Sequence, residues 1–240
     1  MRIRFTVFLV FLVSLPGLYG AAASASSFVL VRWVDDGDTV VLADGRRVRY
    51  CGINAPEVAH KERPAQRFGP EARDVNRKLV FKKPVRLEFD REKHDQYGRV
   101  LAYLFLKDGT FVNAELVKSG CAHYVFRRPN KKYDSLLLRL QRKAMAKKVG
   151  MWEGFPDQRG SFLGNRHSKR FHQTTCPFGK GTSLKRRIIF KTSYDAFWEG
   201  YSPCKKCFKG SALITLRSWS VQQPSEGSGP VPRHNGQTRS

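Results

Sequence analysis

The stretch DDGDTVVLADGRRVRYCGINAPE, residues 35–57, decides how the first half of the chain folds. Two runs rich in β-branched residues flank Asp44-Gly45, a pair that is typical of a tight hairpin turn. The stretch also gathers five acidic residues around three arginines, although the whole chain carries a formal net charge of +24. A basic chain that concentrates acids in one place is expected to hold a cation there and a polyanion around it.

The composition allows one catalytic domain and a small additional module. The chain has 240 residues, of which 41% are apolar and 17 are Phe, so it can bury a substantial core. The excess of 44 Lys and Arg over 20 Asp and Glu indicates a polyanionic partner such as nucleic acid, anionic lipid or acidic polysaccharide. A generally basic, soluble surface is the alternative.

The first 25 residues have the pattern of a secretory signal peptide. Arg2 and Arg4 precede an apolar run over residues 5–15, and small residues follow up to Ala25. The run is shorter than the roughly 20 residues that a membrane span requires. We therefore expect a secreted or periplasmic protein with no stable membrane association after cleavage, and an uncleaved anchor is the alternative.

Three regions follow the signal. Residues 27–154 alternate five short strand patterns, at 27–34, 38–43, 46–53, 84–90 and 99–106, with helix patterns at 70–81, 112–120 and 133–150. This order predicts an α+β domain, a five-stranded β-barrel of the OB-fold type with three helices. Residues 160–210 form a basic module with cysteines, and residues 217–240, rich in Pro, Gly and Ser, are expected to be disordered.

The residue types around the opening stretch suit metal and phosphate chemistry. Asp38 and Asn54 offer the hard oxygen ligands that Ca²⁺ or Mg²⁺ prefers. Glu57 follows closely and could act as a general base toward water. Arg49 and Arg99 have guanidinium groups that match phosphate oxygens. Taken singly, each of these residues is better explained as an ordinary turn residue.

Their order along the chain resembles the staphylococcal nuclease (thermonuclease) family. The motifs DDGDTV, VRYCGINAPE, FGPEA, DQYGRVLAYLF and VNAELVKSG follow one another between about Val29 and Trp152. The resemblance implies an OB-fold barrel with three helices. It also implies an endonuclease or phosphodiesterase that hydrolyses DNA and RNA with Ca²⁺ and leaves 3′-phosphate ends.

The resemblance also implies roles for particular residues. The calcium ligands would be Asp38, Asn54 and the backbone carbonyl of Ala55. The catalytic residues would be Arg49, Glu57 and Arg99, with Glu57 as the general base and both arginines on the phosphate. Tyr97 would pack on the nucleotide.

Two departures from the family pattern affect these expectations. The family has Asp where this chain has Asn54, so one negative charge of the cation site is lost. An amide oxygen still ligates Ca²⁺, but the metal affinity should fall and the metal preference could shift. The family also has tyrosines where Arg127 and Arg128 precede Pro129. Phosphate contact by the two arginines is expected there instead.

The C-terminal module has the residue spacing of a zinc site. Cys204 and Cys207 form a C-x₂-C pair, and His172 and Cys176 are four residues apart. A Cys204–Cys207 disulfide is the alternative in an oxidising compartment. The segment resembles the Ada-type zinc-binding domain, which implies Zn²⁺ and DNA contact. That family has a methyl-accepting Cys where this chain has His172, so the repair reaction is not carried over.

Cys51 and Cys121 are left open between a disulfide and two buried thiols. The function expected from the sequence is a secreted, monomeric, metal-dependent phosphodiesterase acting on DNA, RNA or both. The alternative is a catalytically weak nucleic-acid-binding protein on the same OB-fold. A third hypothesis is a DNA-repair protein that accepts methyl groups. His172 disfavours it, because it stands where that family has the methyl-accepting Cys.

Overall fold

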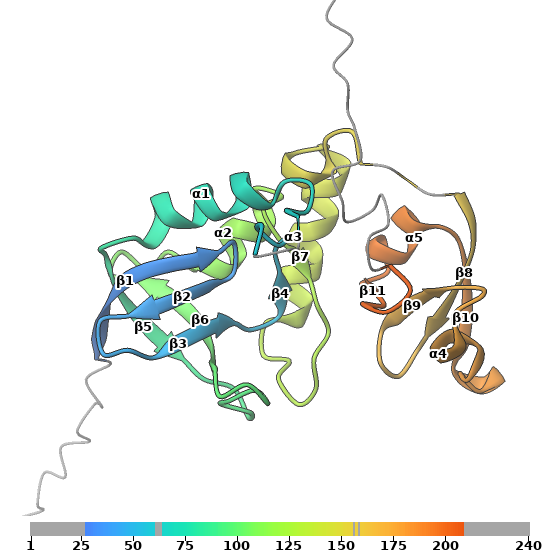
Figure 1. Cartoon of the computed structure of the whole chain (residues 1–240), viewed down its shortest axis with the longest axis horizontal. Coiled ribbons are helices and arrows are strands. Elements are labelled where there is room, and N and C mark those ends of the chain that lie inside the picture. Colours follow the sequence, from blue (N-terminus) through green and yellow to red (C-terminus); the bar gives the residue numbers. More distant parts are fainter. Residues whose placement is uncertain (1–26, 61–63, 156, 158, 209–240) are drawn as a thin grey trace, which may run out of the picture.

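The computed structural model describes residues 27–60, 64–155, 157 and 159–208. These residues form a β-barrel with three helices and a second, smaller sheet beside it (Figure 1). The predicted signal, residues 1–25, and the predicted disordered tail, residues 217–240, lie outside the described residues. In the described part, no helix is long and apolar enough to cross a bilayer.

Five strands close the barrel in the order β1-β2-β3-β6-β5, which confirms the predicted five-stranded barrel. They are β1 (Phe28–Asp36), β2 (Thr39–Leu42), β3 (Arg47–Tyr50), β5 (Pro84–Glu88) and β6 (Val100–Leu106). Neighbouring strands are antiparallel except β3 and β6, which pair in parallel. Fully buried aliphatic side chains such as Val31, Leu42 and Val85 fill the interior.

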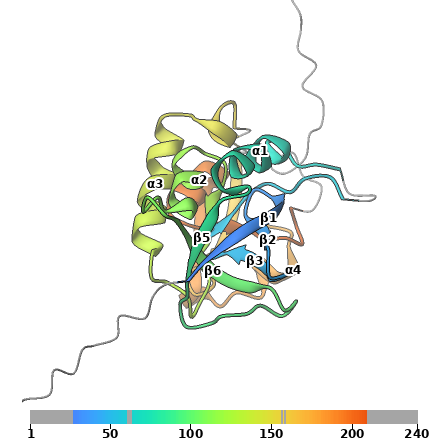
Figure 2. The same ribbon diagram turned by 90° about the vertical axis from the view of Figure 1, so that its left-hand side faces the viewer.

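The three predicted helices are also present: α1 (Gly69–Val80), α2 (Val112–Lys118) and α3 (Asp134–Ala146). Pro70 lies in the first turn of α1, where its missing N–H costs no hydrogen bond. Asn76 of α1 is fully buried and donates a hydrogen bond from Nδ2 to the carbonyl of Asp36, 2.9 Å away. In Figure 2, α1 lies over β1, and α2 and α3 lie next to each other.

A short pair of strands was not expected from the sequence. β4 (Ile53–Asn54) and β7 (His123–Tyr124) are antiparallel, with Ile53 opposite Tyr124 and Asn54 opposite His123. Two residues per strand give too little periodicity to be recognised in a sequence. The pair fixes where the chain runs after β3, and it therefore fixes the position of Asn54.

The C-terminal part is built on a four-stranded sheet in the order β10-β8-β9-β11. Its strands are β8 (Arg159–Asn165), β9 (Arg170–Gln173), β10 (Arg187–Thr192) and β11 (Ser202–Pro203). Its helices are α4 (Pro177–Lys180) and α5 (Ser193–Trp198). Short 3₁₀ turns occur at η1 (Gly150–Trp152) and η2 (Leu184–Arg186). We refer to residues 159–208 as the C-terminal module.

The C-terminal module and the barrel domain share a hydrophobic core. Met145 of α3 and Trp152 of η1 are buried in one cluster with module residues that include Phe171 and Phe197. The ring centroid of Phe197 lies 5.3 Å from that of Trp152 and 5.4 Å from that of Phe171. The chain segment near residue 155 therefore separates two sheets, but the packing continues across it.

Replacing Phe197 should destabilise the whole protein. Its side chain is 3% exposed, so Phe197→Ala leaves a cavity between α3 and the module and should cost about 3–5 kcal/mol. Urea unfolding followed by tryptophan fluorescence measures the loss. Phe178→Ala is the matched control, because Phe178 is 62% exposed and should change stability by less than about 0.5 kcal/mol. Equal stabilities of the two variants would contradict the shared core.

Candidate metal and phosphate site

Asp38 carries a buried carboxyl group in the turn directly before β2. Only 4% of the residue is exposed. Its Oδ2 atom accepts a hydrogen bond from the backbone N–H of Ala55 at 2.6 Å and lies 2.9 Å from Nη2 of Arg49. A buried charge is tolerated when it is paired and hydrogen-bonded in this way.

Gly37 allows the turn that carries Asp38 to lie close to the loop that carries Ala55. A Cβ atom on Gly37 would lie 2.5 Å from Cβ of Ala55 and 3.0 Å from Cβ of Ala72. Any larger residue would push the turn away from the loop that carries Ala55. In the same turn, Asp36 accepts a hydrogen bond from the backbone N–H of Asp38 at 2.8 Å. The Asp-Gly-Asp motif therefore sets both the turn and the carboxylate.

Arg49 joins the expected metal ligands to one another. Its Nη2 atom donates to Oδ1 of Asn54 at 3.0 Å as well as pairing with Asp38, and its Nη1 donates to the carbonyl of Tyr50 at 3.0 Å. Asn54 in turn donates from Nδ2 to the carbonyl of Ala55 at 2.9 Å. The structure thus brings Asp38, Asn54, Ala55 and Arg49 into one cluster.

The electrostatics of this cluster favour an additional positive charge. The pKa of the Asp38 carboxyl is raised to about 8, because the effect of burial, with a smaller contribution from the nearby Asp36, outweighs the lowering by the Arg49 guanidinium. A divalent cation would stabilise the ionised carboxylate in this environment. The oxygen-only donor set of Asp38, Asn54 and the Ala55 carbonyl fits Ca²⁺ or Mg²⁺.

Glu57 lies two residues beyond Ala55 with its side chain exposed. Its backbone N–H donates to Oε1 of Gln66 at 2.9 Å, and its carbonyl accepts from the N–H of Gln66 at 2.8 Å. Within the described residues its carboxylate makes no hydrogen bond or ion pair. A fixed backbone with an exposed carboxylate suits a residue that takes a proton from a ligand.

Arg99 is held in place by a residue that the sequence analysis missed. Asp95 pairs with Arg99 through Nη2 at 2.7 Å and Nε at 2.8 Å. Burial raises the pKa of Asp95, but hydrogen bonds from the Arg99 side chain and backbone outweigh it and lower the pKa overall. The D-x₃-R spacing could have indicated this pair. Tyr97 is 74% exposed, and the Arg99 guanidinium lies 5.6 Å from its ring centroid.

Arg127 and Arg128 are exposed on the loop that follows β7. Arg127 forms an ion pair with Glu92 at 3.5 Å, and Arg128 lies 5.3 Å from the ring centroid of Phe126. Neither contacts the Asp38 cluster. His123 is buried, and burial lowers its pKa to about 4, so it is neutral and adds no positive charge near pH 7.

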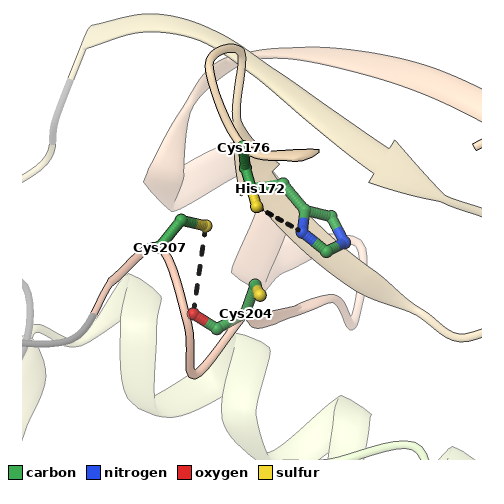
Figure 3. Close-up of side chains that lie close together, drawn as sticks. All are labelled: His172, Cys176, Cys204 and Cys207. Carbon is green, nitrogen blue, oxygen red and sulfur yellow. Dashed lines mark hydrogen bonds between the residues drawn. The ribbon is translucent and has the colours of Figure 1, made fainter. Parts of the chain in front are cut away.

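The four residues of the predicted zinc site converge, as Figure 3 shows. The ligand atoms of His172, Cys176, Cys204 and Cys207 all lie within 4.8 Å of one another. Sγ of Cys176 is 3.5 Å from Nδ1 of His172. A Cβ on Gly179 would lie 2.8 Å from Cβ of His172, so glycine lets α4 pack beside this ligand. The arrangement fits a tetrahedral Zn²⁺ site with three thiolates and one imidazole.

All five cysteines are free thiols in the structure. The Cys204–Cys207 disulfide considered from the sequence is therefore not formed. Cys51 and Cys121 are both buried, but in different surroundings. Sγ of Cys51 accepts a hydrogen bond from Nδ2 of Asn130 at 3.6 Å, and Sγ of Cys121 accepts one from Oγ of Ser119 at 3.3 Å. Of the two alternatives for this pair, the structure has the buried thiols.

Comparison with known proteins matches the barrel domain. The family described as staphylococcal nuclease homologue matches residues 47–154. The thermonuclease of Staphylococcus intermedius is 42% identical over 127 residues, which cover 52% of this chain and 75% of the relative. The chain belongs to the staphylococcal nuclease family. Membership of this family places it among the nucleases, a class of hydrolase.

Further relatives include the thermonuclease of Staphylococcus hyicus, 36% identical over 133 residues that cover 54% of this chain and 78% of the relative. The endonuclease YncB of Bacillus subtilis is 35% identical over 133 residues, with 52% of this chain and 62% of the relative covered. The family match ends at residue 154, before β8 begins at Arg159. The Cys/His cluster, which consists of His172, Cys176, Cys204 and Cys207, therefore lies outside the matched region.

We expect the purified protein to contain one zinc ion per chain, held by the Cys/His cluster. Cys176→Ser should remove most of it, because a serine hydroxyl is a far weaker zinc ligand than a thiolate. Cys121→Ser is the matched control and should keep the zinc. Elemental analysis together with thiol titration makes the measurement. A folded, metal-free protein with a Cys204–Cys207 disulfide would contradict the assignment.

Proposed function

We propose that this member of the family is a secreted, metal-dependent phosphodiesterase that hydrolyses DNA, RNA or both and leaves 3′-phosphate ends. The observation that carries the proposal is the single cluster formed by Asp38, Arg49, Asn54 and Ala55. A buried carboxylate, two neutral oxygen donors and a guanidinium are the groups needed to hold a hard cation against a phosphate.

In this proposal Asp38, Asn54 and the carbonyl of Ala55 hold Ca²⁺, or Mg²⁺ in its place. The bound cation would stabilise negative charge on the phosphate. Asn54 must turn its amide for this, because its Nδ2 donates to the Ala55 carbonyl at 2.9 Å. The missing negative charge and this internal hydrogen bond should both weaken metal binding relative to an aspartate.

Glu57, Arg49 and Arg99 have different roles in the reaction. Glu57 takes a proton from the attacking water, which its exposed carboxylate is free to do. Arg49 and Arg99 donate hydrogen bonds to the phosphate oxygens as charge develops. The bond between phosphorus and the 5′ oxygen breaks, and the leaving 5′ oxygen takes up a proton from solvent water. Asp95 holds Arg99 in position, and Tyr97 offers an exposed ring beside Arg99 on which a nucleotide can pack.

We further propose how the protein binds its substrate strand and zinc, and where it acts. Arg127 and Arg128 contact the phosphates of the substrate strand from the loop after β7. The Cys/His cluster holds Zn²⁺ and supports the fold of the C-terminal module, since metal binding at such a site adds to folding free energy. The protein acts as a monomer outside the cytoplasm after residues 1–25 have been removed.

The test is a hydrolysis assay with residues 26–240 on single- and double-stranded DNA and RNA in the presence of Ca²⁺, Mg²⁺ or EDTA. The proposal predicts metal-dependent cleavage that EDTA abolishes, and products with a phosphate on the 3′ end. A protein that binds DNA tightly but cleaves none of these substrates would favour the alternative, a catalytically weak nucleic-acid-binding protein.

Glu57→Gln should reduce turnover by about 10²- to 10⁴-fold, the usual contribution of a general base, and leave DNA affinity close to that of the wild type. Single-turnover cleavage and fluorescence anisotropy measure the two quantities. The matched control is Glu71→Gln, an exposed glutamate in the first turn of α1, which should cleave normally. Normal turnover in Glu57→Gln would remove the general-base assignment.

Asn54→Asp should raise the calcium affinity by about tenfold or more, because it adds an anionic ligand and cannot donate to the Ala55 carbonyl. Isothermal titration calorimetry with CaCl₂ measures the dissociation constant. The control is Asn165→Asp, which changes the same charge in the C-terminal module. An unchanged or weaker calcium affinity in Asn54→Asp would mean that Asn54 is not a ligand.

A further inference from the structure

The backbone of Tyr124 is held from two sides by side chains of other elements. Its N–H donates to Oε1 of Gln141 in α3 at 2.6 Å. Its carbonyl accepts from Oγ of Ser202 in β11 at 3.3 Å and lies 2.9 Å from Nδ1 of the preceding His123. The β7 strand therefore depends on groups outside its own short sheet for its position.

Gln141 connects β7 to the C-terminal module through a single side chain. It is fully buried, and its Nε2 atom donates to the carbonyl of Phe197 in α5 at 2.5 Å. One partner is an N–H group and the other is a carbonyl, so the side chain between them must both accept and donate, as the Gln141 amide does. Leaving either backbone group unpaired in this buried position would be costly.

On the module side, these contacts come from residues next to the proposed zinc ligands. Ser202 precedes Cys204 by two residues, and the N–H of Cys204 donates to the carbonyl of Phe171 at 2.9 Å. Phe171 directly precedes His172, and its ring packs against Phe197. In Figure 1, α5 and β11 are the parts of the module that lie toward α3 and β7.

On the barrel side, the contacts end at the proposed calcium site. His123 is the β7 residue opposite Asn54, and its ring centroid lies 5.2 Å from that of Phe197. Thus Phe197 of the module contacts His123, the residue paired with Asn54. The module also fixes the backbone of Tyr124. Ser202 donates to the Tyr124 carbonyl, and Gln141, which is bonded to the module at Phe197, accepts from the Tyr124 N–H. These contacts form a continuous path between the two clusters.

We infer that Gln141 and Ser202 are positioning residues that connect the Cys/His cluster to the cation site at Asn54, so that zinc in the module strengthens calcium binding in the barrel. The inference rests on the proposed function for the calcium site. Because coupling between two sites is reciprocal, calcium would strengthen zinc binding by the same factor. Couplings of this kind typically change affinity by about 5- to 150-fold, and a value near the lower end is expected for a path of few contacts.

The experiment compares Ser202→Ala and Gln141→Met with the wild type. Ser202→Ala removes one hydrogen bond with little change in volume, so it should fold even if Gln141→Met does not. Thr182→Val is the matched control, because Thr182 is 6% exposed and accepts a hydrogen bond only within the module, from Asn165 at 3.4 Å. Each protein is measured for zinc content, for hydrogen exchange at the Tyr124 amide and for calcium affinity.

Ser202→Ala and Gln141→Met should both keep one zinc per chain. In both variants the Tyr124 amide hydrogen should exchange at least about tenfold faster than in the wild type, and calcium should bind about fivefold more weakly. The control, Thr182→Val, should leave the zinc content, the Tyr124 amide exchange and the calcium affinity unchanged. Wild-type protein freed of zinc by a zinc-selective chelator should show the same weakening of calcium binding.

Unchanged Tyr124 exchange and calcium affinity in both variants, with normal calcium binding by the wild type, would overturn this inference and leave the proposed function standing. Weakening in the control as large as in Ser202→Ala would overturn it as well, because the effect would then be one of general stability. A wild-type protein that binds no calcium would overturn the coupling, and one that binds neither calcium nor magnesium would overturn the proposed function as well.

Discussion

The burial of the Asp38 carboxylate is the constraint on which the site depends. A buried carboxylate requires hydrogen-bond donors and a positive charge, and here Ala55 and Arg49 supply them at 2.6 and 2.9 Å. Gly37 is required for the approach, since any side chain there would collide with Ala55 and Ala72. Asp36, Asp38 and Arg49 thus belong to one arrangement, in which the turn, the strand β3 and the loop after it are fixed around the Asp38 carboxyl group.

The sequence predicts the parts of this arrangement that depend on local signals. The Asp-Gly turns, the strand patterns and the helix patterns are local, and the barrel with three helices follows from their order. The residues of the proposed cation site carry a sequence signal because the motifs around Asp38 and Asn54 are short and ordered. Gln141 and Ser202 carry no such signal, because an amide or hydroxyl in a helix or strand has no local mark of a distant partner. The β4–β7 pair and the core shared by Trp152 and Phe197 depend on long-range packing and were missed for the same reason.

The barrel and the C-terminal module are more closely joined than their sequence motifs indicate. The family match covers the barrel domain alone, yet buried residues of α3 and η1 need the aromatic side chains of the module to complete their core. A small sheet of this size buries little apolar surface by itself, so a metal at the Cys/His cluster and the shared core are complementary sources of stability. The same contact surface also fixes the strand opposite Asn54, which links stability of the module to the geometry of the proposed active site.

The most direct test of this account is a crystal structure of the protein grown with calcium, with the ion located by its anomalous scattering. We expect an ion bound by the Asp38 carboxylate, the Asn54 amide oxygen and the Ala55 carbonyl, with the Asn54 amide turned away from Ala55. A well-ordered structure in which the Asp38–Arg49–Asn54 contacts are unchanged at millimolar calcium, with no ion beside them, would contradict it.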